Sequence, residues 1–77
     1  MTDFRMSGRV QQVGAGEFLA IVTAVPENGD HGQIRTLSQL LPSLLEAKQI
    51  AAHLMRRMGE VVVRIEGRIT AVETDGI

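Results

Sequence analysis

Residue types that often carry out chemistry are few in this chain, and their spacing does not match a known reactive arrangement. His31 stands beside Asp30 in a turn-forming region, with Glu27 nearby, and His53 stands alone on the polar side of a helical pattern. Two histidines without matched spacing do not predict a metal site, and solvated side chains are the simpler interpretation. We therefore predict no metal, no cofactor and no catalytic residue.

Serine and glycine motifs lead to the same conclusion. Ser7, Ser38 and Ser43 fall where a strand, a turn and a helix cap are expected. The Gly14-Ala15-Gly16 segment is shorter than a dinucleotide fingerprint and precedes a strand instead of a helix. The Gly29–Gly32 segment has the Gly-x-x-Gly spacing of KH domains, but it lacks flanking helices and basic charge. The sequence predicts a non-enzymatic protein.

Arginine makes up seven of the eight basic residues and gives one further candidate site. Arg5 and Arg9 share a face of the first expected strand, and Arg64 and Arg68 would project beside them if their strands are neighbours. Such a strip suits nucleic-acid backbone phosphates. The near-neutral charge and the lack of stacking aromatic residues favour cross-strand Arg–Glu pairs instead. Nucleic-acid binding through these arginines is therefore the alternative function.

Length and composition restrict the fold. The chain has 77 residues, a formal net charge of −1, 44% hydrophobic residues, two phenylalanines and no cysteine. These values exclude a multidomain enzyme, a disulfide-stabilised module and a thiolate zinc site, and they predict a single domain over residues 1–77. Chains this small without disulfides or metals often need a partner for stability. Because no apolar run predicts a signal peptide or a membrane span, we expect a cytoplasmic protein without membrane contact.

Strands are expected in the first half of the chain. Residues 4–13 alternate between apolar and polar, and Gly14-Ala15-Gly16 closes a hairpin to a second, largely apolar strand over residues 17–25. The Asn28-Gly29 pair is a turn signal, after which a short third strand around residues 33–37 or a long loop is expected.

A helix is expected from Leu44 to Met58. Ser43 and Glu46 fit a capping box, and Gly59 is expected to end the helix. The apolar positions share one arc of the helix and are Leu44, Ala47, Ile50, Ala51, Leu54, Met55 and Met58. Strands over residues 60–65 and 68–72 are then expected, joined by a turn at Glu66-Gly67. This order predicts an α+β two-layer sandwich, in which one amphipathic helix covers one face of a mostly antiparallel sheet of four or five strands.

One helix covers one face of such a sheet, yet the strands are apolar on both faces. In the second strand, Leu19, Ile21 and Val25 lie opposite the core-facing side chains, and Val62 does the same in the expected strand after the helix. A row of aliphatic side chains that faces solvent is typical of an interaction site. We predict a homodimer, or a complex with another protein, through these four residues. Scattered exposed aliphatic residues, a small-molecule site, and helix contacts through Leu45 and Ala52 are the alternatives.

Part of the chain resembles HicB-type antitoxin domains. The resemblance rests on the apolar segment 18–22, then Pro26, Gly32 and Thr36, and finally Glu46-Ala47 at the start of a helix. Here Thr36 is separated from Glu46-Ala47 by an insertion that contains Pro42. The resemblance implies a small partial RNase H-like fold, binding to a protein partner, and dimerisation.

Overall fold

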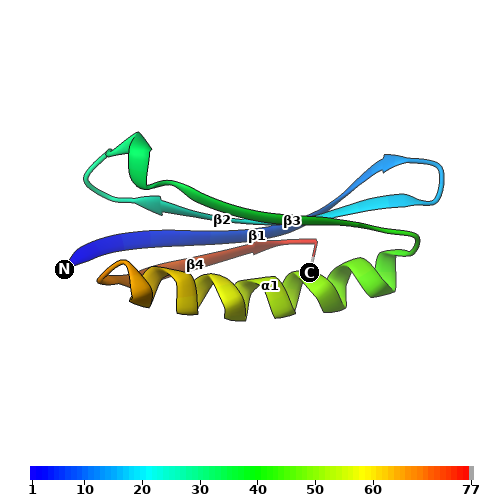
Figure 1. Ribbon diagram of the computed structural model, residues 1–77. Coiled ribbons are helices and arrows are strands. Elements are labelled where there is room, and N and C mark those ends of the chain that lie inside the picture. The colour runs from blue at the N-terminus through cyan, green and yellow to red at the C-terminus, as the bar shows by residue number, and fades with distance from the viewer. Residues whose placement is uncertain (77) are drawn as a thin grey trace.

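A computed structural model describes residues 1–76 and shows one long helix packed on a four-stranded sheet (Figure 1). This arrangement confirms the α+β fold with a single helix on one face of the sheet. The elements in chain order are β1 (Thr2–Gly14), β2 (Glu17–Pro26), a short 3-10 helix η1 (His31–Gln33), β3 (Arg35–Leu41), α1 (Leu44–Arg64) and β4 (Gly67–Asp75).

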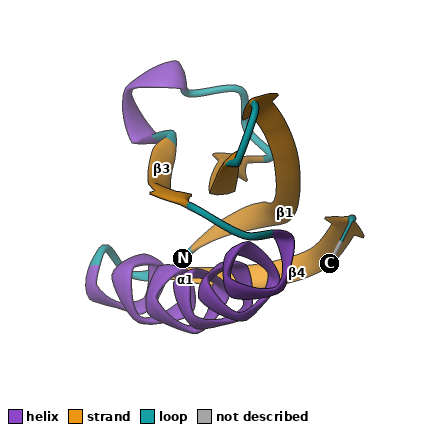
Figure 2. Cartoon of the chain, turned by 90° about the vertical axis from the view of Figure 1, so that its right-hand side faces the viewer, coloured by secondary structure: helices purple, strands orange, loops and turns teal. Residues whose placement is uncertain are grey.

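The strand order in the sheet is β3-β2-β1-β4. Strands β1, β2 and β3 form an antiparallel meander, whereas β4 returns through α1 and pairs parallel to β1. The sheet is therefore mostly antiparallel, as predicted, and β3 and β4 are its two edge strands. Seen along the axis of α1, the helix lies on one side of the sheet and β4 runs beside it at the rim (Figure 2).

The core lies between α1 and one face of the sheet. Alternate residues of β1 and β2 supply one side, because successive strand residues point to opposite faces. A line of helix residues about one turn apart supplies the other side. The buried apolar side chains are Phe4, Met6, Ala20, Val22 and Ala24 from the sheet, and Ala47, Ala51, Leu54, Met58 and Val62 from α1.

The helix begins as expected but continues past its expected end. The Ser43 Oγ accepts a hydrogen bond from the Glu46 backbone N–H at 3.2 Å, and also donates one to the Glu46 carboxylate at 3.3 Å. The predicted stop at Gly59 is wrong, because α1 runs on to Arg64 with Ile65 as its C-cap. Glu66, which has a φ of 60°, follows the cap. The predicted strand over residues 60–65 is therefore also wrong.

Packing explains why this valine-rich segment is helical. Val62 follows Met58 by four residues and therefore extends the buried line of α1 by one more turn. Its side chain is fully buried. Burial of a valine is worth about 1.5–3 kcal/mol, which exceeds the small helix-propensity penalty of β-branched residues.

The segment before the helix also differs from expectation. The third strand occupies Arg35–Leu41, later in the chain than predicted, and η1 fills the start of the range expected for it. One strand follows the helix instead of two, so the order is β-β-β-α-β with four strands in all.

Candidate interaction surface on the open face of the sheet

The face of the sheet opposite α1 is the candidate site, and we call it the open face. The cross-strand register identifies its members, because side chains of directly paired residues lie on the same face. The pairs on this face between β1 and β2 are Arg5 with Val25, Ser7 with Thr23, Arg9 with Ile21, and Gln11 with Leu19. From β3, Leu40, Ser38 and Thr36 pair with Leu19, Ile21 and Thr23 on the same face.

Aliphatic side chains form the β2–β3 half of the open face. Leu19 and Ile21 are half-buried because they lie on a central strand between flanking side chains, whereas Val25 is 41% exposed and Leu40 is 60% exposed. The helix α1 packs on the other face, whereas η1 contacts β2 and lies at one end of the sheet, on the side away from α1 (Figure 1). Three of the four residues predicted for the interface, Leu19, Ile21 and Val25, lie together on the face that α1 leaves uncovered.

Val62 does not belong to this surface. It lies on α1 and is fully buried against the other face of the sheet. A β-carbon built on Gly67 would lie 2.8 Å from the Val62 Cγ1 and 2.6 Å from the Phe4 ring, which shows how tightly this corner is packed. The prediction that Val62 lies on a second sheet face is wrong because its segment is helical.

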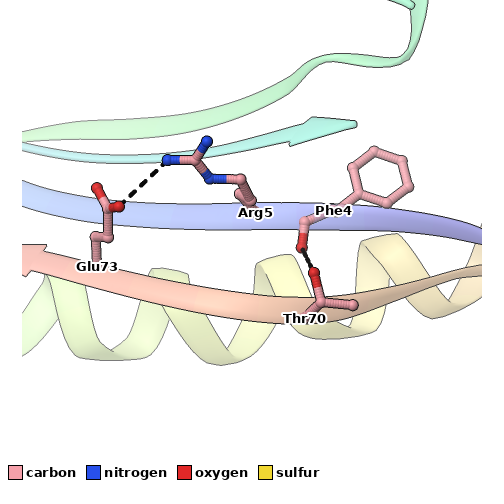
Figure 3. Close-up of polar contacts among 4 residues, drawn as sticks. All are labelled: Phe4, Arg5, Thr70 and Glu73. Carbon is pink, nitrogen blue, oxygen red and sulfur yellow. Dashed lines mark hydrogen bonds and ion pairs between the residues drawn. The ribbon is translucent and has the colours of Figure 1, made fainter. Parts of the chain in front are cut away.

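Charged side chains line the β1–β4 half of the open face. Arg5 on β1 forms an ion pair with Glu73 on β4, with 3.3 Å between the Arg5 Nη2 and the Glu73 Oε1 (Figure 3). Arg9 is in register with Asp75 one step further along. Two neighbouring hollows of about 530 and 310 Å³ border these charged residues, and they share Ser7 and Glu73 in their linings.

The structure brings together only part of the predicted arginine strip. Arg5 and Arg9 lie on the open face of β1 and Arg68 lies on the same face of β4, in register with Asp3, whereas Arg64 lies in the last turn of α1. Arg68 lies at the start of β4, and its Nε donates a hydrogen bond to the Asp3 carboxylate at 2.7 Å. This hydrogen bond and the charge of Asp3 raise the pKa of the Arg68 guanidinium. Two of the four arginines are therefore paired with carboxylates.

Polar residues elsewhere have structural roles. Asp30 caps η1 by accepting a hydrogen bond from the Gly32 N–H at 3.0 Å, and Asn28 accepts one from the Asp30 N–H at 2.9 Å. His31 and His53 are both exposed, on η1 and α1 respectively. Within residues 1–76, no three His, Cys, Asp or Glu side chains gather closely enough to hold a metal ion.

Sequence reasoning missed two parts of the surface. Leu40 lies outside the short third strand expected around residues 33–37, although the alternation of Thr36, Ser38 and Leu40 with Leu37 and Leu41 is a strand pattern. Glu73 was missed as the partner of Arg5 because β4 reaches Asp75 and pairs parallel to β1, which no local pattern indicates.

Comparisons with protein families, with curated proteins and with solved structures found no match to this chain. Within residues 1–76, α1 is the only α-helix, and it is not apolar enough to cross a membrane.

Proposed function

We propose that this protein is a small non-enzymatic interaction module that self-associates through the open face of its sheet. The observation that carries the proposal is the uncovered aliphatic group formed by Leu19, Ile21, Val25 and Leu40 on that face. In an antiparallel sheet with one solvated face, polar residues normally occupy these positions. Burying the group against a second copy removes this apolar surface from water. The proposal includes a cytoplasmic location, which the cysteine-free composition favours.

A second copy suits this face because the face carries both signs of charge. The ion pair of Arg5 with Glu73 and the neighbouring Arg9 and Asp75 make the β1–β4 half nearly balanced. A balanced surface does not repel its own copy, and two-fold symmetry allows arginines of one copy to face carboxylates of the other. The resemblance to HicB-type domains implies dimerisation as well, and we keep that resemblance as part of the proposal.

Nucleic-acid binding is the weaker alternative. A backbone-binding strip needs several unpaired cations, and here Arg5 and Arg68 are held by carboxylates while Arg64 lies on the helix. The alternative predicts salt-sensitive binding that weakens when Arg5 and Arg9 are both replaced by glutamine. A gel that shows no shift with DNA or RNA at low salt excludes it.

Substitution of Ile21 by lysine tests the proposal. A lysine in the middle of the open face puts a charge into the buried interface, so Ile21→Lys should halve the particle mass in sedimentation at micromolar concentration. Because Ile21 is half-buried, circular dichroism must show that the variant is folded. Leu40→Lys, at a position that is 60% exposed on the same face, is the second variant and should have the same effect.

Leu45→Lys is the matched control. Leu45 is 67% exposed on α1, on the other side of the molecule, and its substitution should leave the mass unchanged. The proposal is wrong if folded Ile21→Lys and Leu40→Lys keep the wild-type mass. It is also wrong if Leu45→Lys alone lowers the mass, because the helix then makes the contact.

A further inference from the structure

The free edge of β4 is a second exposed surface of the molecule. Strand β4 borders β1 on one side and ends the sheet on the other. Its backbone N–H and C=O groups on the outer side are available to a further strand. No proline interrupts the strand, and Val72 stands at this edge with 54% of its surface exposed.

A bulge decides which β4 residues share a face. Phe4 pairs with Ile69 and Arg5 with Ala71, so Thr70 is an extra residue in β4. Without it, Ile69 and Val72 would point to opposite faces, because they are three residues apart. With the bulge, both lie on the helix side, since their partners Phe4 and Met6 are core residues. For the same reason Arg68 and Glu73 both lie on the open face.

We propose that two copies pair antiparallel through their β4 edges, around a two-fold axis between Thr70 and Ala71. In this register Ile69 lies opposite Val72 of the second copy, and Arg68 lies opposite its Glu73. Each pair occurs twice by symmetry. Because of the bulge, this register pairs like with like on the helix side, where Ile69 faces Val72. On the open side it pairs opposite charges, because Arg68 faces Glu73.

A groove between α1 and β4 supports this pairing. It has a volume of about 730 Å³ and is lined by Ile69 and Arg68 of β4 and by Arg56, Gly59, Glu60, Val63 and Arg64 of α1. Val63 is 69% exposed there. The second copy's Val72, placed opposite Ile69, lies next to this groove and covers apolar surface that is otherwise in water.

The other edge of the sheet lacks the charge complementarity of β4. Arg35 is the only charged residue of β3, so no register of two β3 strands sets a cation against an anion. Pairing around Ser38 sets Thr36 against Leu40, and pairing around Gln39 sets Ser38 against Leu40, so in both registers Leu40 faces a polar side chain. A second copy is therefore the occupant that fits β4 and not β3.

This inference goes beyond the proposed function, because the β4 edge and the open face are separate surfaces. A two-fold axis between antiparallel strands keeps both helices on one side of an eight-stranded sheet. The two open faces then form one continuous surface, twice as large as in a single copy. With both surfaces occupied, the assembly contains four chains.

Disulfide cross-linking tests the register, because the chain has no cysteine of its own. In the proposed pair, Arg68 and the second copy's Glu73 have Cα atoms about 4.5–5.5 Å apart, within disulfide range. Under mild oxidation the double variant Arg68→Cys/Glu73→Cys should therefore run mostly at twice the monomer mass on a non-reducing gel. Within one chain these positions are roughly 15 Å apart and cannot bridge.

The single variants are the matched controls. In this register each residue lies roughly 15 Å from its own copy in the partner, so Arg68→Cys alone and Glu73→Cys alone should stay monomeric on the gel. The proposal is overturned if the double variant does not cross-link, or if a single variant cross-links equally well. Reduction must return all samples to monomer.

A second measurement uses no cysteine. Val72→Asp places a charge at the paired edge and should halve the particle mass, whereas Val13→Asp makes the same change at a 47% exposed position near the β1–β2 turn and should not. Equal masses for both variants overturn the inference. Adding Ile21→Lys to the Arg68→Cys/Glu73→Cys variant tests the two surfaces independently. Cross-linking that persists in this variant supports pairing through the β4 edge even if the open face makes no contact.

Discussion

Close packing around Gly67 controls how β4 starts. This glycine follows the left-handed Glu66 and lies where Phe4 and Val62 meet, at the junction of β1, α1 and β4. A side chain at this position has no free volume, because both neighbours are fully buried and cannot rotate away. The glycine is therefore required by close approach and not by its backbone angles.

Substitution of Gly67 by alanine should destabilise the protein. The new β-carbon would lie 2.6 Å from a carbon of the Phe4 ring, so the ring or the strand must shift. Overpacking of this kind lowers the free energy of unfolding by about 1–3 kcal/mol. Urea unfolding followed by circular dichroism measures the change. An alanine variant as stable as the wild type would contradict the described packing.

At the scale of elements, the length of α1 is the main departure from the sequence prediction. The capping box at Ser43 and Glu46 is a local signal, and it located the helix start correctly. The end depends on tertiary contacts, because Val61–Val63 have strand propensity and become helical through the burial of Val62. Gly59 resembled a stop signal but lies in the interior of the helix.

Substitution of Gly59 by alanine tests whether α1 stops at Gly59, as the sequence predicts, or continues to Arg64, as in the structure. No heavy atom outside the helix backbone lies within 4 Å of the position where a β-carbon would stand. Alanine should therefore raise the free energy of unfolding by about 1 kcal/mol, the difference in helix propensity between the two residues. The same urea titration measures it, with Gly67→Ala as the variant of opposite sign. A loss of stability would instead indicate that the helix ends at residue 59.

The faces of β2 show what sequence alternation does predict. Ala20, Val22 and Ala24 are buried, and Leu19 and Ile21 lie on the open face, as the period of two requires. The position of β4 was not predictable in this way, because a parallel pairing between residues 65 or 66 positions apart leaves no local pattern. For the candidate site, the alternation therefore predicted the aliphatic residues of β2 on the open face. The ion pair of Arg5 with Glu73 was not predictable, because it depends on the pairing of β1 with β4.

The molecule as a whole is thin, and its sheet is covered by a helix on one side. A single helix covers one face, and the extents of 41 × 19 × 16 Å leave much of the chain near solvent. Small chains of this kind bury a limited fraction of their surface, so association stabilises them further. The open face and the β4 edge are the two surfaces that we propose for this association.

The solution mass of the wild-type protein shows whether the chain self-associates. Sedimentation equilibrium or light scattering over a range of micromolar concentrations should give a particle of at least two chains, with the mass rising with concentration by mass action. A single-chain mass throughout that range would contradict the account, because both proposed surfaces would then remain in water.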